Sequence, residues 1–525
     1  MDLPALLDAL ARPGAYPHPV DRVELCQTHI SAVFLAGPFA YKIKKPVNFG
    51  FLDFSTLERR QHFCHEEVRL NRRLAPEVYL GVVPVALDTG GLPAFETQGE
   101  PVEFAVKMRR LDPALTLESR LECGTLSAGE VRQLGSRLAA FHAHAERSMD
   151  TAAGGAFVAV AANARENFTQ LEPAIGRTLR RSVFERLRAR TEAELERLRP
   201  LFEARAARGV PCDTHGDLHL DHVYLDPSRS PPTDLTIVDC IEFNTRFRYA
   251  DPVADLAFLA MDFVFHGRSD FARELSDAYF ASSEDAEGRA LLPFYLAYRA
   301  VVRGKVEGFA LEEVEVPEAE KALDLARARA HFLLALGTLE LPVQRPALVL
   351  SAGLPGAGKS VLARMLAERA GFERVASDDV RKELAGLPPT QRGGLDLYTP
   401  AMSDRTYAEV LERVQSGLLE GKRMLADATF IREVRREAFL TAARELCVPV
   451  RILVCTAPES VILPRLAART GDSSDADADV YRQLKSQWQP SGPRTLKETR
   501  ILDASNTPDA TYAQAEQALR EAGLI

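Results

Sequence analysis

The chain has 525 residues, of which 46% are hydrophobic and 26% charged, and its formal net charge is −9. This length exceeds what a single hydrophobic core supports, so two or three domains are expected. The acidic balance argues against broad nucleic-acid binding and against attachment to an anionic membrane surface. The sequence shows no secretory leader, no long uncharged apolar stretch and no Cys-x-x-Cys pair among its seven cysteines, which together predict a cytoplasmic protein.

The first 340 residues are predicted to mix strands and helices. An apolar strand over residues 39–44 comes first. Apolar residues at helical spacing then predict helices over residues 58–75, 127–147, 183–208 and 318–336. Ser127 and Glu130 suit a capping box at the start of the second of these helices.

A polar motif lies between the third and fourth predicted helices. It runs His215-Gly216-Asp217-Leu218-His219-Leu220-Asp221-His222. Two short apolar runs follow it, residues 223–225 and 235–239, separated by a turn rich in proline and serine, and they predict a hairpin. This hairpin would bring Asp217 close to Asp239, an arrangement that suits a general base beside a metal ligand.

These residues resemble the aminoglycoside phosphotransferase family, which shares the protein-kinase fold, over residues 25–335. The resemblance implies a two-lobed α+β domain in which Asp217 is the catalytic base and Asp239 binds the metal. It also implies a strand lysine paired with a helix glutamate, for which Lys42 and Glu67 are best placed, and such a pair would position the phosphates of ATP. The alternative is that Lys42 is a surface lysine beside an ordinary helix face.

One position departs from the family pattern. The family has Asn five residues after the base, where it binds metal, and this chain has His222. Imidazole nitrogen suits Mn²⁺ or Zn²⁺ better than Mg²⁺, and manganese is a candidate cofactor of this module. A rival interpretation is a metallohydrolase site built from His215, His219 and His222 with Asp217 or Asp239. The remaining histidines considered are expected at the surface: His62, His65, His142 and His144.

The pattern changes after residues 341–346, where two prolines forbid a continuous helix. We therefore place the boundary there and predict domains over residues 1–340 and 341–525. Beyond it, short apolar strands alternate with helices, which is typical of a parallel α/β sheet. The predicted elements are strands 347–352, 424–426 and 450–455 and a helix over 361–370.

A phosphate-binding motif follows the first of these strands and matches G-x-x-x-x-G-K-[ST] at every position. It consists of Gly353, Leu354, Pro355, Gly356, Ala357, Gly358, Lys359 and Ser360. Its backbone N–H groups would surround the phosphates of ATP, with Lys359 reaching the β- and γ-phosphates and the Ser360 hydroxyl binding Mg²⁺. Asp427, at the end of the predicted strand 424–426, is placed for an outer contact to Mg²⁺ or for the acceptor.

Residues 346–490 resemble the kinase domain of polynucleotide kinases and related predicted P-loop kinases of the AAA type. The resemblance implies that Asp378 accepts the proton of the acceptor hydroxyl and that Arg381, three residues later, contacts the acceptor. The alternative is that Ser377 or Asp379 caps a helix over residues 380–385.

The same resemblance implies that Arg465 and Arg469 belong to a lid over the phosphates. The alternative for this pair, four residues apart, is a solvated helix face.

Together these observations predict a tandem fusion of two ATP-dependent kinase modules. The expected acceptor is a hydroxyl of a small molecule or of a nucleotide end, and the expected cofactors are ATP and Mg²⁺, with Mn²⁺ a candidate for the N-terminal module. The alternative is a P-loop ATPase switch fused to a kinase-like binding module that is weak or inactive in catalysis.

Overall fold

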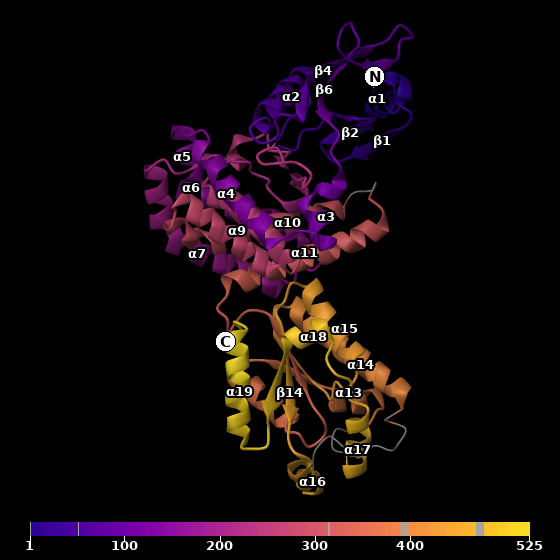
Figure 1. Ribbon diagram of the computed structural model, residues 1–525, viewed down its shortest axis with the longest axis vertical. Helices are drawn as coiled ribbons and strands as arrows, with labels where there is room; N and C mark the ends of the chain where they lie inside the picture. Colours follow the sequence, from indigo (N-terminus) through magenta and orange to yellow (C-terminus); the bar gives the residue numbers. More distant parts are fainter. Residues whose placement is uncertain are drawn as a thin grey trace. The chain divides into compact units, whose positions relative to one another are not determined.

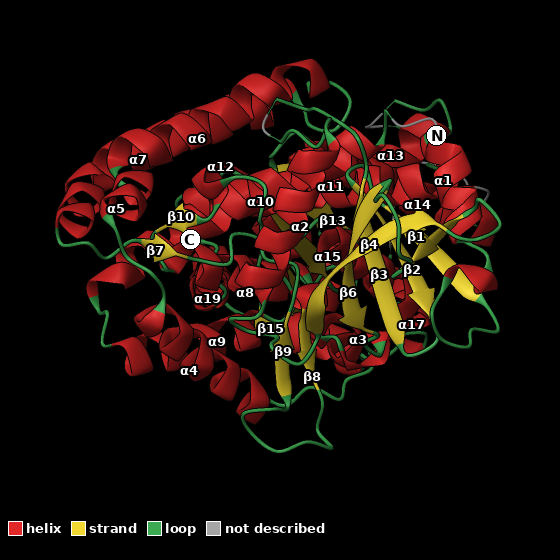
Figure 2. Cartoon of the chain, turned by 90° about the horizontal axis from the view of Figure 1, so that it is seen from above, coloured by secondary structure: helices red, strands yellow, loops and turns green. Residues whose placement is uncertain are grey.

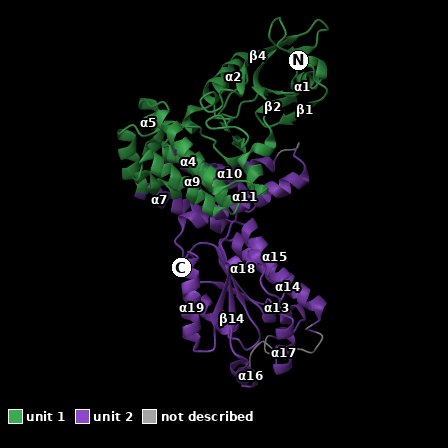
Figure 3. Ribbon diagram, in the orientation of Figure 1, with its two compact units in different colours: residues 1–160, 198–295 green, residues 161–197, 296–525 purple. Residues whose placement is uncertain are grey.

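The computed structural model describes residues 2–50, 52–312, 316–388, 391, 397, 399–468 and 477–525. The chain folds into two compact units, shown in Figure 3. Unit 1 contains residues 1–160 and 198–295, and unit 2 contains residues 161–197 and 296–525. Three helices contribute residues to both units: α6 (Phe157–Leu171), α7 (Arg181–Ala207) and α10 (Leu292–Ala310).

Unit 1 begins with a six-stranded antiparallel sheet in the order β1-β2-β3-β6-β4-β5, whose strands are yellow in Figure 2. The strands are β1 (Val23–Gln27), β2 (Ser31–Ala36), β3 (Phe39–Lys44), β4 (Tyr79–Leu87), β5 (Pro93–Phe95) and β6 (Glu103–Arg109). Strand β3, which carries Lys42 and Lys44, pairs with β2 and β6 and is therefore interior to the sheet.

Helix α2 (Leu57–Asn71) packs against β4 and β6. Thr56 caps it, because its side chain accepts a hydrogen bond from the Arg59 N–H. The inner face buries Cys64 and Val68, and it also buries Glu67 completely. A carboxylate placed so deeply requires a cationic partner, and β3 supplies two, Lys42 and Lys44.

The rest of unit 1 is mostly helical. Its helices are α1 (Leu3–Leu10), α3 (Leu117–Glu122), α4 (Ala128–His144), α5 (Met149–Gly155), α8 (Val253–Phe265) and α9 (Ser269–Ser283). The predicted capping box of Ser127 and Glu130 is confirmed at the start of α4. The predicted hairpin is also confirmed, since β8 (Val223–Leu225) pairs antiparallel with β9 (Leu235–Ile237). A second two-stranded pair joins β7 (Cys212–Asp213) to β10 (Tyr249–Ala250).

Unit 2 contains the predicted parallel sheet, in the order β12-β13-β11-β14-β15. Its strands are β11 (Ala347–Ala352), β12 (Glu373–Ala376), β13 (Arg423–Asp427), β14 (Val450–Thr456) and β15 (Thr499–Asp503). Strand β11 is central and wholly buried, which explains its unbroken apolar sequence.

Helices cover both faces of this sheet, as Figure 1 shows around β14. On one face, α12 (Lys359–Ala370) and α19 (Pro508–Glu521) share a core with the strands. On the other, α13 (Ser377–Leu384), α14 (Pro400–Leu419) and α15 (Glu433–Glu445) pack together. The remaining helices are α11 (Glu318–Leu339), α16 (Glu459–Ala467), α17 (Ala478–Ser486) and α18 (Pro493–Glu498). Within the described chain, none of the helices combines the length and apolarity that crossing a membrane demands.

Candidate functional site

The phosphate-binding motif forms the turn between β11 and α12. Gly353 has φ +141°, and a Cβ there would lie 2.5 Å from the Cys455 carbonyl oxygen, so this position needs glycine. Gly358, with φ +92°, is the residue directly before α12. The Ser351 hydroxyl donates to the Lys359 carbonyl at 3.0 Å and so fixes the end of the loop to its own strand. The loop therefore meets the start of a helix, where backbone N–H groups and the helix dipole favour an anion.

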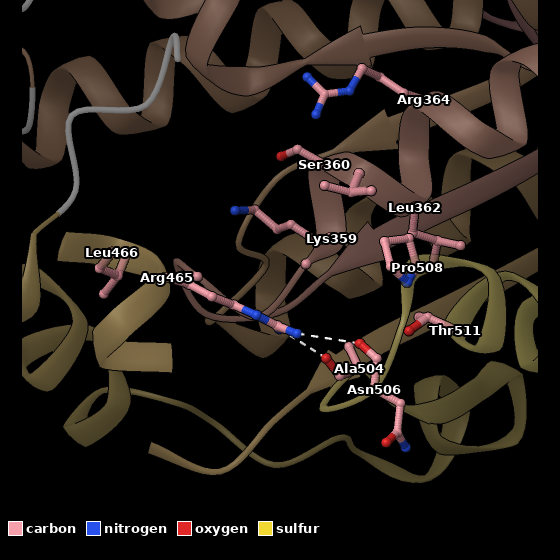
Figure 4. Close-up of a pocket in the computed structure, with 13 residues that line it drawn as sticks. Lys359, Ser360, Leu362, Arg364, Arg465, Leu466, Ala504, Asn506, Pro508 and Thr511 are labelled. Carbon is pink, nitrogen blue, oxygen red and sulfur yellow. Dashed lines mark hydrogen bonds between the residues drawn. The ribbon is translucent and has the colours of Figure 1, made fainter. Parts of the chain in front are cut away.

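A cavity of about 270 Å³ opens beside this loop (Figure 4). Lys359 and Ser360 line it together with Gly356 and Gly358. Its opposite wall carries Arg465 from α16, Ala504 and Asn506 from the loop that follows β15, and Pro508 and Thr511 from the first turn of α19. Leu354, Pro355 and Ala357 complete the turn, and the Ala357 N–H donates to the Leu354 carbonyl at 3.2 Å.

Asp427 ends β13, directly beside Ser351 of β11 in the parallel register. Its Oδ1 lies 3.4 Å from the Ser360 hydroxyl, which brings two predicted Mg²⁺ contacts together. Both donate oxygen, the ligand atom that Mg²⁺ prefers, so these two residues fit that ion. The other oxygen, Oδ2, accepts from the Arg374 guanidinium at 2.7 Å. Sequence reasoning missed Arg374, because it lies on a different strand and no local pattern links it to Asp427.

Asp378 and Arg381 lie on α13 and form an ion pair of 2.9 Å between Oδ1 and an Nη atom. The Arg381 residue is buried, whereas the Asp378 side chain is 26% exposed. Helix α13 begins at Ser377, earlier than predicted, and among the described residues no side chain caps its first turn. The capping alternative for Ser377 and Asp379 is therefore wrong.

Arg465 points its guanidinium at the loop after β15. It donates to the Ala504 carbonyl at 2.8 Å and lies 3.4 Å from the Asn506 carbonyl, as the dashed lines of Figure 4 indicate. It lines the same cavity as Lys359, so a freely solvated helix face does not describe it. Arg469, the second predicted lid residue, lies outside the described residues.

In unit 1, Lys42 joins two carboxylates that are far apart in the sequence. Its Nζ lies 2.9 Å from Glu67 Oε1 and 2.6 Å from Asp239 Oδ1. Burial alone would raise the pKa of Asp239, but Lys42 and His222 outweigh it and hold that pKa below its usual value. With these contacts, Lys42 is not a surface lysine and Glu67 does not lie on an ordinary exposed helix face, so that alternative is wrong.

A second, deeper ion pair lies beside the first. Lys44 Nζ is 2.7 Å from Glu67 Oε2 and also contacts Glu242 Oε1, and all three side chains are buried. Burial raises the pKa of Glu242 even though Lys44 opposes this. Glu242 was missed by sequence reasoning, since nothing but its position three residues after Asp239 marks it. Through Lys44, the segment that carries Asp239 and Glu242 is linked to β3 and to Glu67 of α2.

His215 and Asp255 shape the backbone of the polar motif. The buried Asp255 carboxylate accepts hydrogen bonds from the N–H groups of His215 at 2.6 Å and Gly216 at 2.9 Å. The His215 Nε2 donates to the Val238 carbonyl at 2.9 Å, and its Nδ1 lies 3.4 Å from the Asp217 N–H. Burial lowers the pKa of His215 to about 4, so the ring is neutral. Both ring nitrogens of His215 are thus engaged within the protein, which argues against its use as a ligand in the rival metallohydrolase interpretation.

Asp217, His219 and His222 lie close together, with His219 buried and the other two partly buried. Their ligand atoms are all within 4.8 Å of one another. His222 Nδ1 donates to the Asp217 carbonyl at 2.8 Å, and its Nε2 lies 3.6 Å from Asp239 Oδ2. The structure thus brings together the predicted base, the predicted metal aspartate and the histidine that replaces asparagine.

One predicted surface residue lies elsewhere. His142 is buried between α4, α8 and α9, where it contacts the Tyr279 hydroxyl at 3.0 Å and Asp255 Oδ2 at 3.3 Å. The apolar stripe of α4 faces α9, and His142 falls on that stripe. His62, His65 and His144 are exposed, as predicted.

Two family models match successive parts of the chain. Residues 51–292 match the phosphotransferase enzyme family, and residues 348–491 match an AAA domain family. Three solved structures cover a third of the chain: a sugar kinase from Janibacter, a gluconokinase from Sinorhizobium meliloti and a putative kinase from Chloroflexus aurantiacus. Their identities are 17%, 18% and 17%, and their TM-scores are 0.27, 0.26 and 0.28. They cover 33–34% of this chain and 93–98% of their own, and similarity at this level says nothing about substrate.

Uncharacterized proteins from Mycobacterium bovis and two strains of Mycobacterium tuberculosis are similar over nearly the whole length. Each is 34% identical over 477 residues, which cover 90% of this chain and 91% of the relative. The chain therefore belongs to the same family as these mycobacterial proteins, and it is a tandem fusion of a phosphotransferase-family domain and an AAA-type, P-loop kinase-like domain.

Proposed function

We propose that the protein is a bifunctional ATP-dependent phosphotransferase whose two modules meet near residue 340. Each module would transfer the γ-phosphate of ATP to a hydroxyl, of a small molecule or of a nucleotide end. One observation carries the proposal: a complete phosphate-binding loop places Lys359 and Ser360 on a cavity, with Ser360 3.4 Å from Asp427.

In the C-terminal module, the loop N–H groups and Lys359 would bind the β- and γ-phosphates and stabilise the charge that develops during transfer. The acceptor oxygen would attack the γ-phosphorus while Asp378 takes its proton, and ADP would leave with the electrons of the broken P–O bond. Bound Mg²⁺ would neutralise phosphate charge, held by Ser360 and Asp427. Arg381, paired with Asp378, would orient the acceptor beside that base.

In the N-terminal module, Lys42 would bind the α- and β-phosphates, and Glu67 would hold this lysine in place. Asp217 would serve as the base and Asp239 as a metal ligand. His222 supplies a nitrogen where an amide oxygen suits Mg²⁺ better, so the residues present do not fit that ion well. We propose Mn²⁺ as the more effective ion in this module, and His222→Asn is expected to raise activity with Mg²⁺.

The test is a screen for phosphorylated metabolites with [γ-³²P]ATP and the full-length chain. Lys359→Ala should remove one set of labelled products and Asp217→Ala another, while the double variant should label nothing. A double variant that still labels acceptors like the parent would refute both assignments.

The His219 and His222 imidazoles beside Asp217 favour one alternative, in which the N-terminal module binds without catalysing and the P-loop module is an ATPase switch. That alternative predicts ATP hydrolysis independent of any acceptor, abolished by Lys359→Ala and untouched by Asp217→Ala. A labelled product that depends on Asp217 would exclude it.

A further inference from the structure

Within the described chain, three side chains of the polar motif have the composition of a transition-metal site rather than a magnesium site. They are Asp217, His219 and His222, and Asp239 adjoins them across His222. The two imidazole rings lie almost in contact, with centroids 3.8 Å apart and planes 38° apart. Both rings point toward carboxylates, and their hydrogen bonds hold them in this orientation.

Each ring is held through its Nδ1 by an oxygen acceptor. His222 Nδ1–H donates to the Asp217 carbonyl at 2.8 Å, and His219 Nδ1 contacts Asp221 Oδ1. Metal-binding histidines characteristically engage the second nitrogen in this way, because it fixes the tautomer and aims the other nitrogen at the ion. The Nε2 atoms are the ones aimed at carboxylates here: His219 at Asp217 Oδ2, 3.5 Å away, and His222 at Asp239 Oδ2, 3.6 Å away.

Two of the separations, from His219 to Asp217 and from His222 to Asp239, are close to those expected around one ion. Zinc–nitrogen and zinc–oxygen bonds of about 2.0–2.1 Å in tetrahedral geometry place neighbouring ligand atoms about 3.3–3.4 Å apart. Asp239 can take part because its Oδ1 is held by Lys42 at 2.6 Å, which leaves Oδ2 on the side of His222.

We propose that Asp217, His219, His222 and Asp239 bind one Zn²⁺-class transition-metal ion, without any need for nucleotide. This proposal rests on the proposed function in one respect, because Asp217, the proposed base of the N-terminal module, becomes a metal ligand when the ion is bound. An Asp217 carboxylate coordinated to Zn²⁺ cannot accept a proton from the acceptor hydroxyl. Zn²⁺ therefore inhibits phosphotransfer by this module.

The experiment measures Zn²⁺, Mn²⁺ and Mg²⁺ binding to the metal-free, full-length chain without nucleotide, by competition with a chromophoric chelator. Two exposed thiols are first removed as Cys26→Ser and Cys123→Ser, because they could bind zinc on their own. One Zn²⁺ per chain is expected, bound more tightly than Mn²⁺ and far more tightly than Mg²⁺. His219→Ala should weaken binding at least about 100-fold and Asp221→Asn about 10–100-fold.

The matched control is His65→Ala, which removes an exposed histidine from α2 and should leave zinc binding unchanged. Binding of Co²⁺ gives a second readout, since its visible absorption is intense in a tetrahedral site and should be lost in His222→Asn. Thermal unfolding of each metal-free variant establishes that the variants are folded.

Zinc binding that is equal in the parent, His219→Ala and His65→Ala would overturn the proposal, as would the absence of stoichiometric binding to the parent. These outcomes are separable from failure of the proposed function. Zinc bound as expected, in a protein that phosphorylates no acceptor, would support the metal site and refute the phosphotransferase. Transfer with Mg²⁺ that is dependent on Asp217, together with no zinc binding, would do the reverse.

Discussion

The two candidate sites of this chain are built on different principles. The C-terminal one is local, because eight consecutive residues form the phosphate-binding motif: residues 353–358 make the turn between β11 and α12, and Lys359 and Ser360 begin α12. The N-terminal one is assembled from three distant segments, with Lys42 on β3, Glu67 on α2 and Asp239 after β9. The comparison teaches that lysines are held in different ways: Lys359 is buried at the edge of a cavity in one site, and Lys42 and Lys44 are paired with the buried Glu67 in the other.

This difference has consequences for mutation. A local loop can lose one side chain and keep its backbone, so function should fail before stability does. In the assembled site, Lys42, Lys44 and Glu67 hold secondary-structure elements together, so stability and function should fail together.

The largest effect is expected from Lys359→Ala. Acceptor phosphorylation by the P-loop module should fall about 10³-fold, because the group that stabilises developing phosphate charge is gone. The measurement uses the full chain with Asp217→Ala in the background, and the melting temperature should stay near that of the parent. Lys497→Ala, an exposed lysine of α18, is the control. Equal turnover in the Lys359 variant would refute the local site.

Asp378→Asn should lower transfer by this same module about 10²–10³-fold, with little change in ATP affinity, because a base acts in the chemical step. Asp379→Asn, the neighbouring residue on α13, is the matched control and should retain most activity. Separate measurement of kcat and of the KM for ATP decides the matter. A reduced melting temperature with unchanged kcat would contradict the assignment of Asp378.

In the assembled site, Lys44→Met should destabilise unit 1 by about 3 kcal/mol, since Glu242 is left buried without its cation while Glu67 keeps Lys42. Circular dichroism in urea measures this, and the single tryptophan, Trp488, reports unit 2 separately. The control is Arg69→Met, which removes the more exposed ion pair between Arg69 and Glu66. It should lower the free energy of unfolding by less than about 1 kcal/mol. Equal losses would show that the buried pair does not hold the site together.

The smallest expected effect is a pH dependence of unit 1 through His266. Burial lowers the pKa of His266, but hydrogen bonds to Asp262 and Glu118 outweigh it and raise that pKa to about 10. Because the folded pKa exceeds the unfolded one, this stabilisation is complete below pH 6.5 and is lost between pH 6.5 and 10. His266→Gln should therefore cost about 1–2 kcal/mol at pH 6, after allowance for solvent screening, and progressively less toward pH 10. A constant difference across this range would contradict the ion pair.

The sequence by itself determined the local features. The phosphate loop, the capping box of Ser127 and Glu130, the hairpin of β8 and β9 and the parallel sheet were all predictable. Each depends on residues a few positions apart, on turn chemistry or on the alternation of short strands with helices. The pairing of Lys42 with Glu67 could also be proposed, because a family resemblance supplied it and the helical period placed Glu67 inward.

Only the tertiary structure decided the partners of the buried charges. Arg374 of β12 forms an ion pair with Asp427 of β13, and Glu242, in the segment after β9, forms one with Lys44 of β3. Asp255 interrupts an apolar helix, which signals a buried carboxylate, but the sequence does not say that it holds the His215 backbone. A local sequence pattern can predict that a charged side chain is buried. It cannot identify the partner of that side chain, because the fold determines which distant segments lie beside it.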